Sequence, residues 1–108
     1  MNLRDNVNGW DFAKTLNVLS TFCRQEADRW YYNPETGERI YLNKGERFAL
    51  IHSEITEAFE GERKNLSFYH FTMWQMIVQV ELADALIRIF DYAGEHKLDL
   101  GVESTEQK

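Results

Sequence analysis

Four acidic side chains at helical spacing are the residues of this sequence best suited to chemistry. Glu54 and Glu57 form one pair three residues apart, and Glu81 and Asp84 form a second. Positions i and i+3 share one face of a helix, so each pair presents two carboxylates in the same direction. Two such pairs on facing helices would supply oxygen ligands for an octahedral Mg²⁺. The spacing therefore predicts a divalent-cation site formed by these four side chains.

The position of both pairs on their helices favours a site inside the fold. On a helical wheel, Glu54 and Glu57 lie at the border of an apolar arc and not on the solvent side. The second pair belongs to the one polar stripe of an otherwise apolar helix. That stripe consists of Glu81, Asp84, Arg88, Asp91 and Glu95. Like charges removed from water are costly unless a cation or hydrogen bonds compensate them.

Ordinary surface ion pairs are the alternative explanation of the same spacing. This alternative pairs Glu57 and Glu60 with Arg63 and Lys64, and Glu81 and Asp84 with Arg88. Such exposed pairs contribute little to stability and occur by chance in many helical proteins. The spacing alone leaves both explanations open.

Three amphipathic segments predict an all-α fold. The first runs from about Trp10 to Trp30, the second from about Lys44 to Lys64, and the third from about His70 or Thr72 to His96. Asn43 and Glu46 have the capping-box spacing ahead of the second segment. We therefore expect a helical bundle of about three to four helices.

The segments that connect the predicted helices, and the end of the third helix, are indicated less clearly by the sequence. Tyr31–Leu42 contains Asn-Pro-Glu-Thr-Gly, which predicts a loop or a short hairpin, and Asn65–Phe68 is a candidate linker. We expect the third helix to end near Gly101, with His96 and Lys97 in its last turn. Residues 1–102 are predicted to form one domain, and residues 103–108 a flexible tail.

The apolar faces of the second and third helices predict how the bundle packs. The main apolar arc of the second helix, expected to face the interior, consists of Phe48, Ile51, Ile55, Ala58 and Phe59. The third helix is apolar around most of its circumference, which is typical of a central helix. Three helices of this size leave such a helix incompletely covered. We therefore expect a homodimer or a homotetramer to complete the bundle.

Composition and charge exclude several classes of protein. The chain has 108 residues, of which 44% are hydrophobic, and we expect most of its three Trp, five Tyr and seven Phe to be buried. No stretch reaches the roughly 20 apolar residues that a membrane span requires. The formal net charge of −6 argues against nucleic-acid binding. It is compatible with a phosphorylated small molecule held through divalent cations.

The cysteine content and the N-terminal residues indicate the compartment. Cys23 is the only cysteine, so no intrachain disulfide can form, and Met1–Asp11 lack the basic start and apolar run of a signal peptide. We therefore expect a cytoplasmic protein without a membrane partner.

Two segments of the chain resemble a known enzyme family. Arg47–Arg63 contains Glu-Ile-Thr-Glu, and Val80–Tyr92 contains Glu-Leu-Ala-Asp, both in an alternating apolar context. This pattern resembles the MazG-like branch of the all-alpha nucleoside triphosphate pyrophosphohydrolases, which share a Glu-x-x-Glu, spacer, Glu-x-x-Asp motif. The resemblance covers about Asn43–Leu100, and the 23 residues between Glu57 and Glu81 are a spacer that the family accepts.

The resemblance implies a magnesium-dependent hydrolase. Such an enzyme binds Mg²⁺, with Mn²⁺ as a substitute, and cleaves a nucleoside or deoxynucleoside triphosphate to its monophosphate and pyrophosphate. This is the chemistry of nucleotide-pool house-cleaning. By motif position, the metal ligands and catalytic residues would be Glu54, Glu57, Glu81 and Asp84. One of the two glutamates of the second helix would also activate the attacking water.

Three basic residues on the acidic stripes are candidates for binding the substrate. Arg88, Lys64 and Arg47 could hold phosphate oxygens or stabilise developing charge. This interpretation rests on their placement and not on the motif. A plain salt bridge is the alternative for Arg88.

Other residues receive simpler interpretations. The aromatic residues Phe48, Tyr69, Trp74 and Tyr92 could stack on a base, but we expect them in the core. We expect His52 to face solvent and Cys23 to lie in the core.

Two functions from other classes compete with the hydrolase. The first is a catalytically silent, nucleotide-sensing or regulatory helical interaction protein of the same fold, and the intact four-acid motif argues against it. The second is a di-iron bundle, which requires Glu-x-x-His pairs that neither motif position offers.

Overall fold

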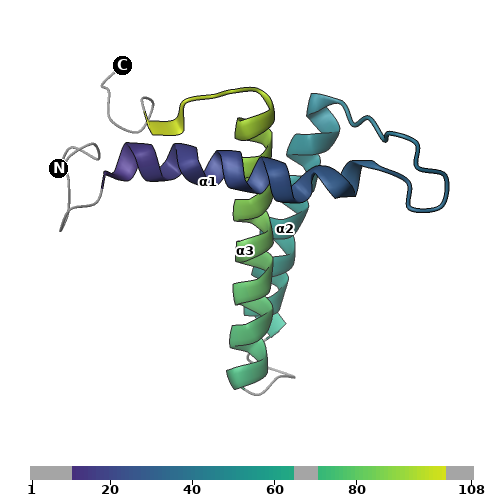
Figure 1. The fold of residues 1–108 in the computed structure, drawn as a ribbon. Helices are drawn as coiled ribbons and strands as arrows, with labels where there is room; N and C mark the ends of the chain where they lie inside the picture. Colours follow the sequence, from purple (N-terminus) through teal and green to yellow (C-terminus); the bar gives the residue numbers. More distant parts are fainter. Residues whose placement is uncertain (1–10, 65–70, 102–108) are drawn as a thin grey trace. The chain divides into compact units, whose positions relative to one another are not determined.

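The computed structural model describes residues 11–64 and 71–101, which form an all-α fold as predicted. The elements are α1 (Phe12–Ala27), the 3₁₀ turn η1 (Asp28–Tyr31), α2 (Lys44–Lys64) and α3 (Phe71–Glu95) (Figure 1). The described residues form no β-strand. None of the helices in these ranges has the length and apolar character needed to cross a membrane. Trp10, His70, the predicted linker Asn65–Phe68 and the predicted tail lie outside the described residues.

The chain divides into two compact units. Among the described residues, the first unit contains 11–41 and 89–101, and the second contains 42–88. The helix α3 contributes its first turns to the second unit and its last turns to the first.

α1 begins at a side-chain cap and buries a narrow face. The Asp11 side chain accepts a hydrogen bond from Lys14 N at 3.1 Å, which satisfies one of the free amides of the first turn. Ser20, Cys23 and Ala27 form the buried face, which confirms the core position of Cys23. The α-helix ends at Ala27, earlier than predicted, because the chain tightens into the 3₁₀ turn η1.

Two glycines allow close packing within the first unit. A Cβ at Gly94 would lie 2.7 Å from the Cβ of Arg24, and a Cβ at Gly101 would lie 2.8 Å from the Cα of Ala13. Real Cβ atoms do not approach other atoms this closely, so α1 contacts the last turns of α3 and Gly101 only because both positions lack a side chain.

The segment after η1 is a short hairpin-like loop, as predicted. Tyr32 and Arg39 form an isolated antiparallel bridge, Asn33 N donates to Glu38 O at 2.8 Å, and Ile40 N donates to Tyr31 O at 2.6 Å. Gly37 turns the chain with a φ of 74°, a conformation that glycine adopts without strain.

α2 has the predicted bounds, and its N-terminus is determined by local hydrogen bonds. Glu46 N donates to Oδ1 of Asn43 at 2.8 Å, and Asn43 N donates to Oε1 of Glu46 at 3.2 Å. These reciprocal bonds are a complete capping box, and they confirm the prediction.

α3 ends differently from the prediction. The helix stops at Glu95, so His96 and Lys97 lie beyond its last turn. Leu98 N donates to Ala93 O at 2.9 Å and Lys97 N donates to Gly94 O at 3.3 Å, while Lys97 has a φ of 55°. This is a Schellman motif with lysine in the left-handed position that glycine usually occupies. The prediction failed because Gly101 was taken as the terminating glycine.

In the second unit, α2 and the first turns of α3 run antiparallel with small and acidic residues between them. A Cβ at Gly61 would lie 2.8 Å from Cγ2 of Ile77, so the missing side chain at Gly61 leaves room for Ile77 between the two helices. The described hydrophobic residues buried in this unit are only Ala58 and Ala85, and Glu54 is buried on the same seam.

Several described large apolar side chains of this unit are nevertheless exposed to water. Seven of them are between 46% and 60% exposed: Phe48, Ile55, Phe59, Met76, Val80, Leu82 and Leu86. The predicted interior position is therefore wrong within one chain for Phe48, Ile55 and Phe59, whereas Ala58 of the same arc is buried and Ile51 is half-buried.

Most of the described aromatic side chains are likewise not buried within one chain. Tyr31 is the only fully buried aromatic residue among those described, and Phe48 is 48% exposed. The core position predicted for Phe48 is wrong, whereas the solvent-facing position of His52 is confirmed. Tyr92 is half-buried, with its ring 4.4 Å from that of His96. Tyr69 and the side chain of Trp74 are outside the described part of the chain.

Candidate metal centre

Three of the four predicted acids converge in the second unit. Carboxylate oxygens of Glu54 and Glu57, from α2, and of Glu81, from α3, all lie within 4.8 Å of one another. Glu54 is buried, Glu57 is exposed and Glu81 is intermediate. The pair on α2 shares a face because of its i, i+3 spacing, and the antiparallel register places Glu81 opposite that pair.

The register follows from contacts on either side of the acids. Gly61 lies against Ile77 toward one end of the helix pair, and Glu54 contacts Arg88 toward the other. Because the helices run antiparallel, Glu57 and Glu81 must fall between these two contacts. The close approach at Gly61 therefore helps to bring the acids together.

The three carboxylates perturb one another strongly. Hydrogen bonding with Glu54 and with Glu57, partial burial and the negative charge of both neighbours raise the pKa of Glu81 from 4.5 to about 7. Three like charges in this space cannot all ionise cheaply without a cation, so one carboxyl retains its proton near neutral pH. The titration belongs to the group of acids and not to one residue in isolation.

Arg88 supplies one positive charge at the edge of this group. Its Nε donates to Oε1 of Glu54 at 3.2 Å, and the two side chains are 31% and 12% exposed. The ion pair joins α3 to α2 and does not follow the i, i+4 spacing along one helix. The alternative interpretation paired Arg88 with Glu81 and Asp84 on its own helix, whereas the structure pairs it with Glu54 on the facing helix.

The remaining predicted site residues lie elsewhere. Asp84 is half-buried one turn after Glu81 and is not among the three converging carboxylates. Arg47 is buried, at 8% exposure, near the start of α2. Lys64 is the last residue of α2, and its side chain is outside the described part of the structure.

The surface ion-pair alternative accounts for part of α2 only. Glu60 and Arg63 form an exposed pair, with 3.3 Å between Oε1 and Nε. Glu57, which the same alternative assigned to that cluster, instead lies beside Glu54 and Glu81.

The three carboxylates offer oxygen ligands of the kind that a small, hard cation would need. With bonds of about 2.1 Å, an octahedral Mg²⁺ holds neighbouring oxygens about 3 Å apart and opposite oxygens about 4 Å apart. The spread of 4.8 Å is slightly wider, so small side-chain rotations would close the ligand set. The site would then retain several water ligands, as Mg²⁺ sites usually do.

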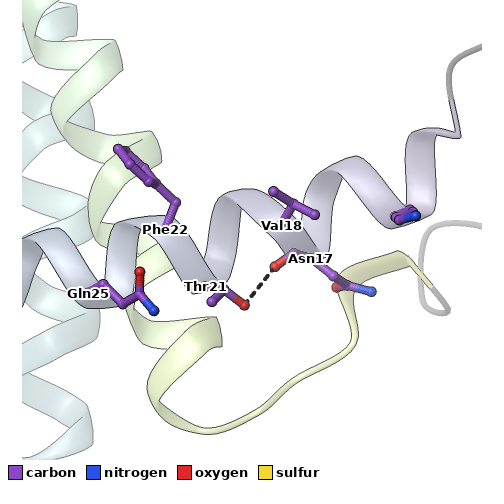
Figure 2. A pocket seen from close by; sticks show the side chains of 6 residues that line it. Asn17, Val18, Thr21, Phe22 and Gln25 are labelled. Atoms are coloured by element: carbon purple, nitrogen blue, oxygen red, sulfur yellow. Dashed lines mark hydrogen bonds between the residues drawn. The ribbon is translucent and has the colours of Figure 1, made fainter.

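Two surface hollows lie apart from the acids. One, of about 600 Å³, follows a single face of α1 and is lined by residues that include Asn17, Val18 and Phe22 (Figure 2). The other, of about 440 Å³, lies beside the first half of α2 and is lined by residues that include Leu42 and Leu50. None of the three carboxylates lines either hollow.

A second polar cluster, in the first unit, has partners that the sequence did not indicate. Asp91 is 1% exposed and accepts hydrogen bonds from Arg24 Nη1 at 2.7 Å and from Tyr31 Oη at 2.5 Å. Arg24 also pairs with Asp28, which Arg39 contacts at 3.1 Å. Hydrogen bonds from Arg39 and Arg24 lower the pKa of Asp28.

The position of Asp91 was predicted, but its role was not. The sequence placed it on the acidic stripe of the third helix, whereas the structure pairs it with α1 and η1. Its 67- and 60-residue separations from Arg24 and Tyr31 leave no local signal in the sequence. Burial and the nearby Asp91 carboxylate raise the pKa of Cys23, which agrees with an unreactive core thiol.

Comparison of the chain with protein-family models, with curated proteins and with solved structures finds no match. The function is therefore inferred from the residues of the site and from the motif that they form.

Proposed function

We propose that the chain is a Mg²⁺-dependent nucleoside triphosphate pyrophosphohydrolase of the MazG-like type, acting on an NTP or a dNTP. The observation that carries this proposal is the convergence of Glu54, Glu57 and Glu81 from two helices. These residues occupy three of the four positions of the Glu-x-x-Glu, Glu-x-x-Asp motif. The raised pKa of Glu81 supports the proposal, because such a cluster gains free energy from binding a divalent cation.

Each motif residue has a proposed role. Glu54, Glu57 and Glu81 would hold the cation, and Asp84 would join them by a change of rotamer from the neighbouring turn of α3. A bound Mg²⁺ neutralises the triphosphate and lowers the pKa of a coordinated water. A glutamate of α2 would accept the proton of the attacking water.

The basic residues would contact phosphate oxygens. Arg88 already lies beside Glu54, so its guanidinium could bind a phosphate while it continues to orient that carboxylate. Arg47 and Lys64 are proposed to assist from the two ends of α2. The expected product pair, a nucleoside monophosphate and pyrophosphate, is consistent with a role in cytoplasmic nucleotide house-cleaning.

The test is pyrophosphate release from a panel of NTPs and dNTPs, with Mg²⁺ and with Mn²⁺. We expect Glu81→Gln to lower kcat/KM at least about 100-fold, because it removes a charged ligand while keeping the side-chain volume. Glu60→Gln is the matched control, since Glu60 pairs with Arg63 outside the acidic group. Equal activity of both variants, or no hydrolysis of any nucleotide, would refute the proposal and leave a silent interaction protein as the alternative.

We also propose that the protein works as a homodimer or a homotetramer. The support is the exposure of large apolar side chains on α2 and α3, which one chain alone leaves in contact with water.

A further inference from the structure

We infer that the hollow beside the first half of α2 binds the base of the nucleotide and that it selects guanine. This inference rests on the proposed function, because it assigns a place to the base of the substrate whose phosphates the acidic group would hold. The hollow is lined by Leu42, Glu46, Ala49, Leu50 and Ser53.

The hollow lies on the same stripe of α2 as one of the three converging carboxylates. Glu46, Leu50, Ser53 and Glu57 follow one another at steps of four, three and four residues, so they share one face of the helix. Glu57 is the exposed member of the acidic group. A molecule held at Glu57 can therefore extend along α2 into the hollow without leaving this face.

The distance along this face suits a nucleotide. In a nucleoside triphosphate, the ribose and the α-phosphate separate the base from the β-phosphate by on the order of 10 Å, which is about two turns of α-helix. Ser53 precedes Glu57 by about one turn, and Leu50 precedes it by about two. A triphosphate bound through a cation at the acids would thus place its base at the hollow.

The size and the apolar lining of the hollow also suit a base. Its volume is about 440 Å³, which falls within the roughly 300–1,000 Å³ that is typical of small-molecule sites. Leu42, Ala49 and Leu50 provide an aliphatic surface, and both leucines are half-buried. A planar ring that lies on this surface removes its own apolar face from water.

The two polar side chains of the hollow offer hydrogen-bond acceptors to a ligand. The Ser53 hydroxyl donates its hydrogen to Leu50 O at 2.8 Å, so its oxygen can only accept from a ligand. Oε1 of Glu46 accepts from Asn43 N, which leaves the other lone pairs of this carboxylate for a ligand. The side chains that line the hollow therefore present acceptors and no free donor.

Guanine is the base whose edge matches these acceptors. Its N1–H and its 2-amino group are adjacent donors, which one carboxylate can accept in a bidentate pair. In adenine and cytosine the amino group lies beside a ring nitrogen that accepts, and in uracil the single N–H lies between two carbonyl oxygens. Each of these edges brings an acceptor against the Glu46 carboxylate, which disfavours its binding.

The test compares kcat/KM for the hydrolysis of GTP, ITP, ATP, CTP and UTP with Mg²⁺. We expect the value for GTP to exceed each of the others at least about fivefold, because each of the others lacks the bidentate pair. ITP is the sharpest comparison, since it differs from GTP only by the missing 2-amino group.

Glu46→Gln should abolish this preference, because an amide presents one acceptor and one donor in place of two acceptors. Glutamine still completes the capping box with Asn43, so the start of α2 is retained. Glu60→Gln is the matched control, because Glu60 lies on the same helix outside the hollow and should leave the preference for GTP unchanged.

Equal kcat/KM for GTP and ITP, or an unchanged preference in Glu46→Gln, would overturn the inference and leave the proposed hydrolysis standing. If no nucleotide is hydrolysed, the proposed activity is refuted, and calorimetry with nonhydrolysable analogues of GTP and ATP tests the hollow directly. Tighter binding of the GTP analogue that Glu46→Gln abolishes would uphold the guanine site. Equal binding of the two analogues, or binding of neither, would overturn it.

Discussion

Arg88 of α3 donates a hydrogen bond from Nε to Oε1 of Glu54 in α2 at 3.2 Å, across the seam that contains the acidic group. The guanidinium therefore compensates part of the negative charge that Glu54, Glu57 and Glu81 bring together. It also competes with any cation for the same carboxylate. The first effect stabilises the metal-free protein, and the second weakens the binding of a cation.

We expect Arg88→Met to lower the stability of the metal-free protein by about 1–2 kcal/mol, because a partly buried carboxylate loses its partner. The same change should tighten Mg²⁺ binding, because a fixed positive charge beside the ligands is removed. Urea unfolding without metal and calorimetric Mg²⁺ titration measure the two effects. Arg63→Met, on the exposed pair with Glu60, should change neither. Weaker Mg²⁺ binding by Arg88→Met would contradict the assigned competition.

The raised pKa of Glu81 predicts how metal-free stability depends on pH. Its folded-state pKa of about 7 exceeds the ordinary value of 4.5, so the folded state binds the proton more tightly than the unfolded state. The resulting stabilisation is fully present below pH 4.5 and is lost as the pH rises to about 7. Glu81→Gln mimics the protonated group at every pH. We therefore expect the stability of Glu81→Gln relative to wild type to increase between pH 4.5 and 7 and to stay constant above.

Chemical denaturation at several pH values in the presence of EDTA measures this difference. Glu60→Gln, at an exposed glutamate of the same helix, should show no comparable change with pH. A constant difference between wild type and Glu81→Gln across this range would show that the acids do not share a proton.

Mg²⁺ should displace the proton that the acidic group retains. Since the metal requires ionised ligands, its apparent affinity should rise up to about tenfold per pH unit below pH 7 and level off above it. Calorimetry at pH 6, in two buffers with different ionisation enthalpies, should detect the release of up to about one proton per site. At pH 8.5 the release should be close to zero. Affinity independent of pH would indicate that Mg²⁺ binds elsewhere.

The sequence was most informative where structure is determined locally. The start of α2 follows from the reciprocal bonds of Asn43 and Glu46, which are three residues apart and need no tertiary partner. The convergence of Glu54 with Glu57 likewise follows from helical spacing. The end of α3 was missed because its terminating residue, Lys97, is one that rarely adopts a positive φ.

Long-range pairing could not be predicted from the sequence. A helical wheel shows that Phe59 and Glu54 lie on different faces of α2, but it does not show which face meets α3. Ala58 and Gly61 lie on the side that meets α3, where Ala58 is buried and Gly61 leaves room for the Ile77 side chain. The partner of Asp91 was also unpredictable, since Tyr31 is 60 residues away.

The cluster around Asp91 predicts a large loss of stability when it is broken. We expect Asp91→Ala to cost about 3–5 kcal/mol, because the side chain is 2% exposed and its removal leaves Arg24 without this carboxylate. Tyr31→Phe removes only the hydroxyl that donates to Asp91 and should cost about 1–2 kcal/mol. Urea unfolding at a fixed protein concentration measures both changes. Tyr41→Phe, at a ring that is 82% exposed, should be neutral.

Lys97 offers a prediction of increased stability. Its φ of 55° lies in the left-handed region, where an L side chain costs about 1–2 kcal/mol and glycine costs little. Glycine also increases the conformational freedom of the unfolded chain, which offsets part of the gain. We therefore expect Lys97→Gly to stabilise the protein by up to about 1 kcal/mol.

Thermal and urea unfolding of Lys97→Gly measure this gain. Glu95→Gly is the control, because it places glycine at the last helical residue of α3 and should lower stability by up to about 1 kcal/mol. A gain of stability from Lys97→Gly together with a loss from Glu95→Gly would show that the helix ends between these two residues. A loss of stability in both variants would mean that the Lys97 side chain contributes more than its backbone conformation costs.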